Sequence, residues 1–489
     1  MRSHAAVSIV SIGLAVLATC FAGHPRASSP AGTANQPGKS VLSVEPRAVW
    51  VWGSDVRTQG AEVVAERLRV RGMTDAILLV KGSGGTVAYP SALAPQAAAG
   101  VDTLGAFLTA CHARGIKVHA WVNYHEDQAY SARTKRANAI WHVRTMPAPP
   151  SPSATENRVC PLAARDGYNQ YFLGVVEEIL DHYDVDGIHL DYIRYPHAVY
   201  CFCPRHQAEA AVRGIDFTRV RTLINKTFYP APGDGKTFFN ALAAGDPDAA
   251  GWVGMREEEI NGVVETVKDL VDSENAMRAA NGRPQVQLSA ALQPEAALSE
   301  SEHLGRSHYA QNYETLARHV SFIAPMAYHK DFNHAPAWVG DVTAGAVAKA
   351  APTPVWAGIQ TYSVTSQEVA DALAAARRNG AAGFVLFRYA VSASGEAAAQ
   401  AIVPSIESLR KATENAGDAG WLDGGTLNSL GQKLRNAEQS LDSGNARAAW
   451  NQLGAFINEL EAQNGKHVDP RAARALAADA AWVRDLIQM

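Results

Sequence analysis

Short apolar runs alternate with amphipathic segments along most of the chain from residue 47 onward. The runs are rich in β-branched and aromatic residues and predict strands, whereas apolar positions three and four apart predict helices. The predicted strands are residues 48–52, 75–82, 116–123, 187–190, 286–292, 320–328, 354–360 and 382–389. The predicted helices are residues 61–72, 102–115, 166–183, 256–282, 312–319, 366–380 and 395–412. Asp102 and Ser366 are expected to open two of these helices.

The alternation of strands and helices indicates a parallel sheet, because a helix must carry the chain back between parallel strands. The strands are apolar throughout, so both faces of the sheet are expected to be covered. Eight such strands predict an α/β protein with a (β/α)8 barrel over residues 45–413. This span exceeds the roughly 250 residues typical of the fold. Two long excursions, residues 128–158 and 197–252, account for the surplus.

After residue 414 the pattern changes to three short amphipathic helices, which predict a small C-terminal helical module over residues 417–489. Its apolar stripes include Leu430, Leu434 and Leu453, and they carry no clustered carboxylates or histidines. A docking or spacer role is therefore favoured over glycan or cell-wall binding, for which the sequence has no positive signal.

The N-terminus, residues 1–22, has a short basic start, an apolar run and small residues, the pattern of a secretory signal peptide. The run is at the short limit for a membrane-spanning helix, which is the alternative. "LATC" at residues 17–20 resembles a lipoprotein cleavage box, so Cys20 is a candidate for lipid attachment to a membrane. Residues 23–44 are rich in Pro, Gly, Ser and Ala and predict a flexible linker. We expect an exported protein, secreted or lipid-anchored at the bacterial cell envelope.

Overall composition is that of a globular protein, with 47% apolar and 19% charged residues among 489. The formal net charge is -4. Because there is no basic surplus, no nucleic-acid partner is predicted. Composition leaves the oligomeric state open.

The cysteines divide into a helical one and a loop group. Cys111 lies in a predicted helix and is expected to be a buried free thiol. Cys160, Cys201 and Cys203 lie in predicted loops of an exported chain, which favours one disulfide among them. "CFCPRH", with His206, is a weak indication of zinc, since only two thiols at C-x-C spacing are evident. No metal site and no cofactor are predicted.

In (β/α)8 enzymes the active site lies where the C-terminal strand ends meet at one mouth of the barrel. Carboxyl groups that follow the predicted strands are Asp55, Glu126, Asp127, Asp191, Glu295 and Asp331. Candidate substrate-binding residues there are Trp52, Lys81, Trp121, Asn123, His125, His189, Arg194, Tyr195, Tyr328, Gln360 and Arg388. No G-x-S-x-G elbow, phosphate-binding loop or H-x-x-E-H motif is present. This set of residues at the barrel mouth favours glycoside hydrolysis, which uses carboxyl groups for proton transfer and charge stabilisation.

The segment "DVDGIHLDYIRYP", residues 184–196, supplies the strongest catalytic candidate. The strand period of two places His189 and Asp191 on one face. If that face points into the barrel, Asp191 lies at the mouth with His189 beneath it. The alternative roles for Asp191 are a helix N-cap or a salt bridge with Arg194.

"VDGIHLDYIRYP" resembles the signature of glycosyl-hydrolase-like family 10, bacterial exported barrels related to polysaccharide hydrolases. "RAVWVWG", "VHAWVN", "IAPMAY" and "GFVLF" stand in the family's order, so the resemblance covers most of residues 47–406. It implies hydrolysis of glycosidic bonds in an extracellular or cell-wall glycan, often one rich in amino sugars. It also implies a catalytic acid at Asp191 and substrate contacts at Asn123, Arg194 and Tyr328.

A fainter similarity links the same segment to the D-G-x-D-x-D-x-E motif of family 18 chitinases, which ends in the acid glutamate. Asp186 and Asp191 match, but His189 replaces an aspartate and Ile193 stands where the glutamate would be. Another residue must therefore supply the second carboxyl group. The candidates for it are Glu295, Glu126 and Asp127, and Glu295 is predicted as catalytic together with Asp191.

The leading hypothesis is an exported glycoside hydrolase that works by acid–base catalysis at the barrel mouth. The second hypothesis is a carbohydrate-binding barrel without catalysis, in which Trp52, Trp121 and Tyr328 are sugar platforms. The third is a metal-dependent polysaccharide deacetylase. For a hydrolase, a carboxyl separation of roughly 5–5.5 Å would indicate retention and roughly 6.5–9.5 Å inversion of configuration.

Overall fold

The computed structural model describes residues 45–135, 139–144, 158–164, 167–389 and 404–487. The predicted signal peptide, the linker and Cys20 lie outside these residues. Among the described residues, no helix is both long and apolar enough to cross a membrane.

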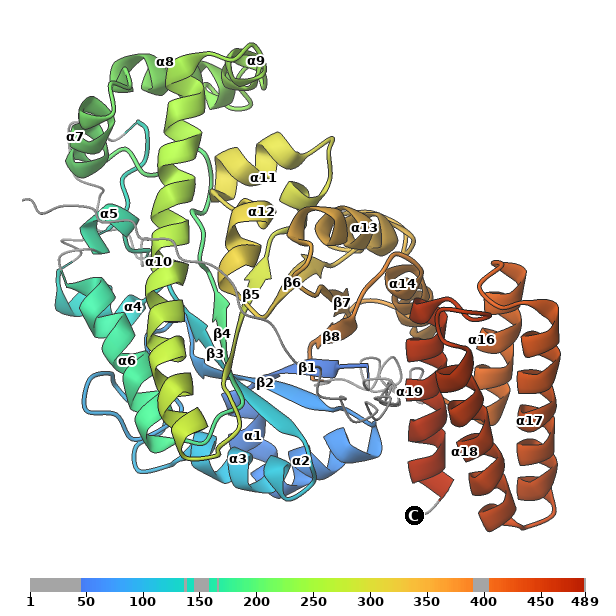
Figure 1. The fold of residues 1–489 in the computed structure, drawn as a ribbon. Coiled ribbons are helices and arrows are strands. Elements are labelled where there is room, and N and C mark those ends of the chain that lie inside the picture. The colour runs from blue at the N-terminus through green and yellow to red at the C-terminus, as the bar shows by residue number, and fades with distance from the viewer. Residues whose placement is uncertain (1–44, 136–138, 145–157, 165–166, 390–403, 488–489) are drawn as a thin grey trace, which may run out of the picture. The chain divides into compact units, whose positions relative to one another are not determined.

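Eight parallel strands close into a barrel, which confirms the predicted fold (Figure 1). Each strand pairs with its neighbours in sequence order, and β1 pairs with β8 to close the ring. The strands are β1 (Arg47–Trp52), β2 (Asp75–Lys81), β3 (Lys117–Asn123), β4 (Gly187–Asp191), β5 (Gln287–Leu292), β6 (Phe322–Ala327), β7 (Trp356–Gln360) and β8 (Gly383–Phe387). Successive residues of each strand point to opposite faces of the sheet, so the strands contribute to two hydrophobic cores. Val49 and Val51 pack in the core between the sheet and the helices, whereas Trp50 packs in the core inside the barrel.

The barrel interior is largely aromatic. The rings of Phe322 and Trp356 stack with centroids 3.6 Å apart and planes 12° apart. His119 and Asp75 form a buried pair at 3.0 Å near the N-terminal ends of their strands. The interior is therefore packed toward the N-terminal strand ends, and the cavity described below lies toward the C-terminal ends.

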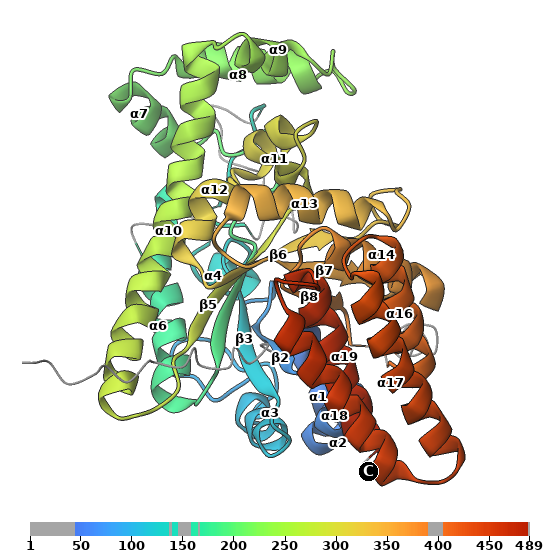
Figure 2. The same cartoon turned by 45° about the vertical axis from the view of Figure 1, so that its right-hand side comes forward.

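Helices follow the strands and cover the outside of the barrel (Figure 2). Those outside the excursion after β4 are α1 (Gly53–Gln59), α2 (Ala61–Val70), α3 (Thr103–His112), α4 (Gln128–Arg133), α5 (Pro161–Ala164), α6 (Tyr168–His182), the 3₁₀ helix η1 (Pro294–Ala297), α11 (Glu302–Tyr309), α12 (Tyr313–Leu316), η2 (Ala317–His319), α13 (Trp338–Ala350) and α14 (Ser366–Arg378). Asp102 caps α3 as predicted, whereas α14 is capped by Thr365 rather than Ser366, with Glu368 completing a capping box. The sequence did not predict α13, because its many Ala, Gly, Val and Thr residues have weak or mixed helix preference.

The excursion after β4 is helical, although the sequence predicted only its last helix. Its helices are α7 (Pro204–Val212), α8 (Phe217–Phe228), α9 (Thr237–Ala243) and α10 (Pro247–Ala280). They build a small core of their own that includes Phe202, Phe217 and Trp252. Helix α10 has 34 residues and is therefore about 50 Å long. It runs past the barrel strands and reaches α8 and α9 beyond them (Figure 1).

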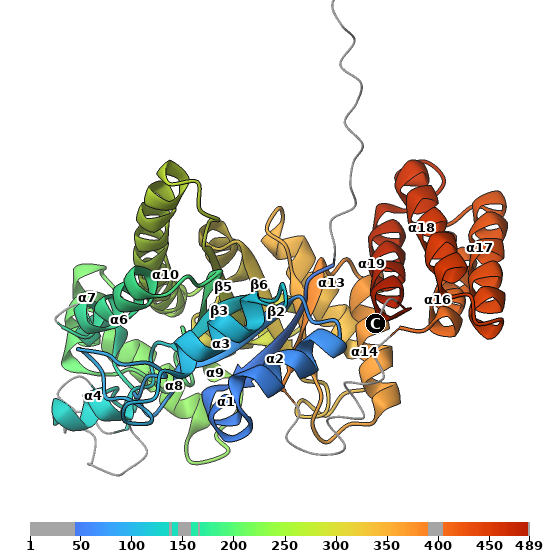
Figure 3. The same cartoon turned by 90° about the horizontal axis from the view of Figure 1, so that it is seen from below.

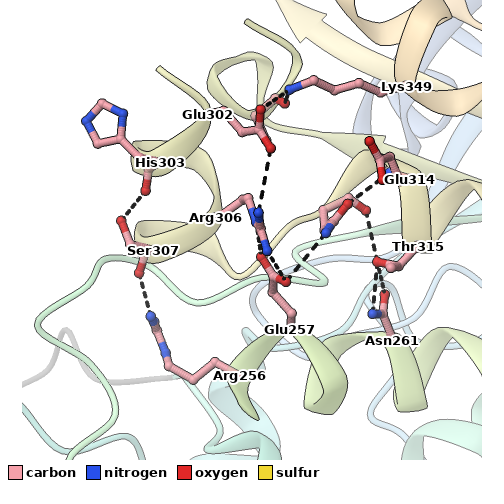
Figure 4. A network of polar contacts seen from close by, with 12 residues as sticks. Arg256, Glu257, Asn261, Glu302, His303, Arg306, Ser307, Glu314, Thr315 and Lys349 are labelled. Carbon is pink, nitrogen blue, oxygen red and sulfur yellow. Dashed lines mark hydrogen bonds and ion pairs between the residues drawn. The ribbon is translucent and has the colours of Figure 1, made fainter. Parts of the chain in front are cut away.

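A network of polar contacts fastens α10 to α11 and α13 (Figure 4). Arg306 of α11 donates to both carboxylate oxygens of Glu257 at 2.6 and 3.0 Å. Lys349 of α13 binds Glu302 at 2.7 Å, and the buried Arg256 donates to a backbone carbonyl of α11. A bidentate arginine–carboxylate pair fixes the relative orientation of the two side chains as well as their distance. The network therefore holds the long helix in one orientation against the barrel.

The C-terminal module has four helices within the described residues 404–487, not the three predicted (Figure 3). They are α16 (Ile406–Asp418), α17 (Gly424–Asp442), α18 (Ala446–Gln463) and α19 (Pro470–Ile487). The sequence assigned α16 to the barrel, but Ile406 and Leu409 share a core with Leu430 and Leu453. The apolar stripe of an amphipathic helix does not reveal which core it will join, and this is the reason for the error. The first part of that predicted helix, residues 395–403, lies outside the described residues.

Candidate active site

The C-terminal strand ends surround a cavity of about 520 Å³. This volume is within the range of about 300–1,000 Å³ that small-molecule sites occupy. The predicted site residues that line it are Trp52, Trp121, Asn123, Asp191, Arg194 and Tyr328. Other lining residues with a part in the site are Trp50, Tyr192, Asp331, Tyr362 and Phe387.

Asp191 ends β4 and is held by two donors at one oxygen. Its Oδ1 accepts hydrogen bonds from the backbone N–H of Tyr192 at 2.6 Å and from Nη1 of Arg194 at 2.7 Å. Tyr192 has a φ of 54°, a left-handed conformation that costs a non-glycine residue roughly 1–2 kcal/mol. The Arg194 guanidinium lies 4.2 Å from the centre of the Tyr192 ring. The salt bridge expected as an alternative role is thus present, and it orients the carboxyl group at the cavity wall.

Asp331, in the loop after β6, is a second carboxyl group in the same cavity. Its Oδ1 accepts from Nε2 of Gln360 at 3.0 Å, and its Oδ2 accepts from the hydroxyl of Tyr362. Gln360 is itself fixed, because its Oε1 accepts from the backbone N–H of Lys330 at 3.0 Å. The sequence placed Asp331 on the rim but did not select it as the partner of Asp191.

Tyr328 connects the two carboxyl groups electrostatically. Burial raises the pKa of its phenol well above the usual value, and the charges of Asp191 and Asp331 both raise it further. Asp191, Asp331 and Tyr328 all line the same cavity.

Glu295, the predicted second acid, does not line the cavity. It lies in η1, where its Oε1 accepts from the hydroxyl of Tyr309 at 3.2 Å. Burial raises the pKa of Glu295, and the positive charge of Arg194 partly opposes that rise. The chain turns at Pro294 directly after β5, so Glu295 lies beside the cavity rather than in it.

The other two candidates for the second acid, Asp127 and Glu126, do not line the cavity either. Asp127 pairs with Lys81 at 2.8 Å, and both side chains are fully buried. Lys81 also donates to the backbone carbonyl of Asn123 at 3.0 Å, so this predicted substrate ligand belongs to the structural core. Glu126 forms a backbone bridge with Arg158 and does not line the cavity.

Aromatic rings form much of the cavity wall. Tyr328 and Phe387 stack with ring centroids 4.9 Å apart and planes 17° apart. Trp50 meets Tyr328 edge-on at 6.4 Å. Trp52 keeps 38% of its surface exposed and carries the Arg388 guanidinium 3.4 Å from its ring centre. Flat apolar faces next to polar groups suit the two-sided surface of a sugar ring.

Two buried polar atoms of residues that line the cavity have no hydrogen-bond partner among the described residues. They are the indole N–H of Trp121 and the Oδ1 of Asn123. The amide nitrogen of Asn123, in contrast, donates to the hydroxyl of Ser83 at 3.1 Å. Buried polar groups normally find partners, so the unpaired N–H and Oδ1 are exceptions among the buried atoms of the cavity wall.

His189 lies beneath the cavity and does not line it. Its Nε2 accepts from the indole N–H of Trp50 at 3.2 Å, and its Nδ1 contacts the hydroxyl of Ser289 at 2.8 Å. Burial lowers the pKa of His189 to about 3. The imidazole is therefore neutral and supports the floor of the cavity rather than moving protons in it.

The remaining predicted substrate-binding residues do not line the cavity, and three of them contact residues that do. His125 contacts the backbone carbonyl of Arg194 at 3.1 Å, and burial lowers the pKa of His125 to about 3. Gln360 holds Asp331, and Arg388 stacks on Trp52. The phenol of Tyr195 points away to His206 and Glu259. The sequence showed that these residues follow the C-terminal ends of the strands, but it did not show whether each side chain points into the cavity.

Among the described residues that line the cavity there is no histidine or cysteine. Hydrolytic zinc sites are built from histidines with a carboxylate or cysteines. The donor set of this cavity therefore does not suit the metal-dependent deacetylase considered from the sequence.

Comparison with protein families gives two matches. Residues 59–192 match the family described as hypothetical glycosyl hydrolase 6, a range that ends just beyond Asp191. Residues 406–485 match the FIMAH domain, a range that begins with α16 and agrees with the four-helix packing. The match is not to glycosyl-hydrolase-like family 10, so the finer family prediction is not supported. No curated protein matches the chain in sequence.

Several solved structures resemble the chain. The PgaB (BpsB) glycoside hydrolase domain from Bordetella bronchiseptica has 13% identity and a TM-score of 0.55, covering 73% of this chain and 98% of that one. The α-L-fucosidase isoenzyme 2 from Paenibacillus thiaminolyticus has 15% identity and a TM-score of 0.44, covering 73% and 48%. The spore cortex-lytic enzyme SleL from Bacillus cereus has 11% identity and a TM-score of 0.39, covering 75% of each chain. With the family match, the first of these supports a glycosyl-hydrolase-like (β/α)8 barrel.

Proposed function

We propose that this protein is an exported glycoside hydrolase that cleaves glycosidic bonds of a polysaccharide at the barrel mouth. The observation that carries the proposal is the presence of two carboxyl groups, Asp191 and Asp331, in one aromatic cavity. The match to hypothetical glycosyl hydrolase 6 supports it, because the matched range includes Asp191.

In the proposed mechanism, Asp191 and Asp331 form the pair of acids that glycoside hydrolysis requires. One carboxyl group protonates the leaving oxygen, and the other stabilises the oxocarbenium-like centre or activates water. Arg194 and the N–H of Tyr192 hold Asp191 in one orientation, while Gln360 and Tyr362 hold Asp331. Such fixed geometry is worth a large part of a rate enhancement, because the reacting groups need not be reoriented.

The proposed substrate is a cell-wall or extracellular glycan that contains amino sugars. The N-terminal signal-like sequence supports export, and the partial match of the β4 segment to the chitinase motif supports the sugar class. Trp52 and Tyr328 would pack against sugar faces, and the side chains of Asn123 and Arg194 in the cavity wall would bind hydroxyl or amide groups.

The test is to incubate the chain, without residues 1–22, with peptidoglycan strands and with amino-sugar polysaccharides, and to identify the products by mass spectrometry. We expect shortened oligosaccharides with a new reducing end. Asp191→Asn should remove product formation while glycan binding is retained. The matched control is Asp181→Asn, which changes an exposed carboxyl group on α6 and should leave turnover unchanged.

The alternative is a binding barrel without catalysis, which the exposed Trp52 and the aromatic wall also fit. Glycan binding by the wild-type protein and by Asp191→Asn, with no product from either, would favour that alternative. Removal of an acetyl group without chain cleavage would refute glycoside hydrolysis.

A further inference from the structure

Apart from the residues that line the cavity, four buried side chains with metal-binding atoms converge on one point. They are Cys160, Cys201, Cys203 and His206, and their ligand atoms all lie within 4.8 Å of one another. The four described cysteines are free, so the disulfide that the sequence favoured is not formed in the structure. The sulfur atoms of Cys160 and Cys203 are 3.7 Å apart.

The chain brings the four residues together from two separate segments. Cys160 immediately precedes α5, while Cys201 and Cys203 lie in the loop between β4 and α7. His206 is in the first turn of α7, three residues after Cys203, so a single helical turn brings their side chains to the same side. Cys160 and Cys203 are 43 residues apart in sequence, which is why the third thiol was not visible as part of a motif.

The spacing of three of the ligand atoms matches a tetrahedral metal site, and the sulfur of Cys201 lies within 4.8 Å of each of them. Zinc bonds of about 2.3 Å to sulfur and about 2.0–2.1 Å to nitrogen require about 3.8 Å between two sulfurs and about 3.6 Å between sulfur and nitrogen. The sulfurs of Cys160 and Cys203 are 3.7 Å apart, and Nδ1 of His206 is 3.5 and 3.3 Å from them. These distances are within a few tenths of an ångström of those values.

The surrounding groups orient the ligands as in metal sites. The other ring nitrogen of His206, Nε2, lies 2.8 Å from the hydroxyl of Tyr195 and 3.3 Å from Oε2 of Glu259. Metal-bound histidines usually donate their second N–H to a carboxylate or another oxygen in this way. The backbone N–H of Trp141 donates to the sulfur of Cys201 at 3.1 Å. Nδ1 of His206 is thereby directed at the sulfurs, and one thiolate already has a hydrogen-bond donor.

We propose that Cys160, Cys201, Cys203 and His206 bind one zinc ion in a closed Cys₃His site. Three thiols lose their protons to solvent as the ion binds, and neutral His206 coordinates through Nδ1. Soft thiolate ligands in a tetrahedral set select zinc over magnesium or calcium. All four positions are filled by protein, so the ion has a structural role and does not activate water.

The site joins two helices to the loop after β4, which lines the cavity. Tyr195 directly follows Arg194, the partner of Asp191, and Glu259 belongs to α10. The ion therefore ties α7 and α10 to the loop that follows β4. Its loss should loosen this region first.

The experiment measures metal directly in the wild-type chain, expressed without residues 1–22 and purified without chelator. We expect about one zinc ion per chain by elemental mass spectrometry, the stoichiometry of a closed four-ligand site. Cobalt(II) exchanged into the site should show thiolate-to-metal charge transfer and the visible bands of tetrahedral coordination. Glu259→Gln should weaken zinc binding roughly 10–100-fold, the usual effect of changing a group behind a metal-bound histidine.

The matched control is Cys111→Ala, which removes a buried thiol in α3 outside the cluster and should keep the full zinc content. The variants Cys203→Ser and His206→Ala should each lose most of the bound zinc. Mapping of cysteines labelled under non-reducing, denaturing conditions should find Cys160, Cys201 and Cys203 as thiols.

A wild-type chain that holds no zinc, and binds none when zinc is added to the reduced protein, would overturn the proposal. A Cys160–Cys203 disulfide in the mapped protein would also overturn it. These readouts do not depend on hydrolysis, so they stand apart from the test of the proposed function.

Discussion

Replacing Asp331 by asparagine and, separately, Glu295 by glutamine tests which carboxyl group works with Asp191. The two residues follow neighbouring strands, but only Asp331 lines the cavity. Each change keeps the shape of the side chain and removes its ability to exchange a proton. Comparing the two variants therefore tests whether the second catalytic carboxyl group lies inside the cavity or beside it.

For Asp331→Asn we expect kcat to fall 10²–10⁴-fold, the usual contribution of a positioned acid or base. This fall corresponds to about 3–5 kcal/mol of transition-state stabilisation at 1.36 kcal/mol per tenfold. Stability should change by less than about 1.5 kcal/mol, because the asparagine oxygen can still accept from Gln360 and its amide can donate to Tyr362.

For Glu295→Gln we expect less than about a fivefold loss of kcat, equivalent to about 1 kcal/mol. The hydrogen bond that its Oε1 accepts from the Tyr309 hydroxyl can be kept by the amide oxygen of glutamine. Burial already favours the neutral carboxyl form of Glu295, which an amide resembles.

The assay is the initial rate on the polysaccharide that the wild-type protein cleaves, with glycan binding and thermal unfolding measured in parallel. Normal unfolding and binding with lost turnover in Asp331→Asn would support the assignment. A hundredfold loss in Glu295→Gln, with Asp331→Asn near wild type, would show that the sequence-based choice of second acid was right and the cavity argument wrong.

Three further predictions concern stability and binding. Lys81→Met should destabilise the fold by about 3–5 kcal/mol, because it leaves the fully buried Asp127 unpaired, and Lys81→Met with Asp127→Leu should recover most of this loss in urea unfolding. His189 has a pKa lowered to about 3, below its value of about 6.5 when unfolded, so its contribution is present above pH 6.5 and is lost as the pH falls toward 3. It should account for about 2 kcal/mol of lost stability between pH 7 and 5, and a His189→Gln variant with an unchanged pH slope would contradict this assignment. Trp52→Ala should raise KM with little change in kcat, since an exposed platform binds ground state and transition state alike; a lower kcat at constant KM would argue against that role.

The barrel and the position of Asp191 at its mouth could be predicted from the sequence because both follow from local patterns. Each strand is a short apolar run, and eight of them in alternation with helices leave few arrangements other than a closed parallel barrel. Asp191 follows such a run directly, so it had to lie at the mouth of the barrel. The hydrophobic pattern also separated the C-terminal helices from the barrel, with the exception of α16.

Other features depended on where long segments lie in space. A residue after a strand end can point into the cavity, as Asp331 does, or beside it, as Glu295 does, and the turn that follows decides which. The excursion folded into helices around a core of its own, which no short sequence window reveals.

The sequence by itself determined the order of the elements, the closed barrel and one carboxyl group at its mouth. Tertiary structure alone placed Asp331 in the same cavity as that carboxyl group and brought Cys160 to Cys203 and His206 across 43 residues of chain. The physical reason is the range of the interactions. Hydrophobic period and capping act within a few residues, whereas a catalytic pair or a metal site requires side chains from distant segments to meet within a few ångströms.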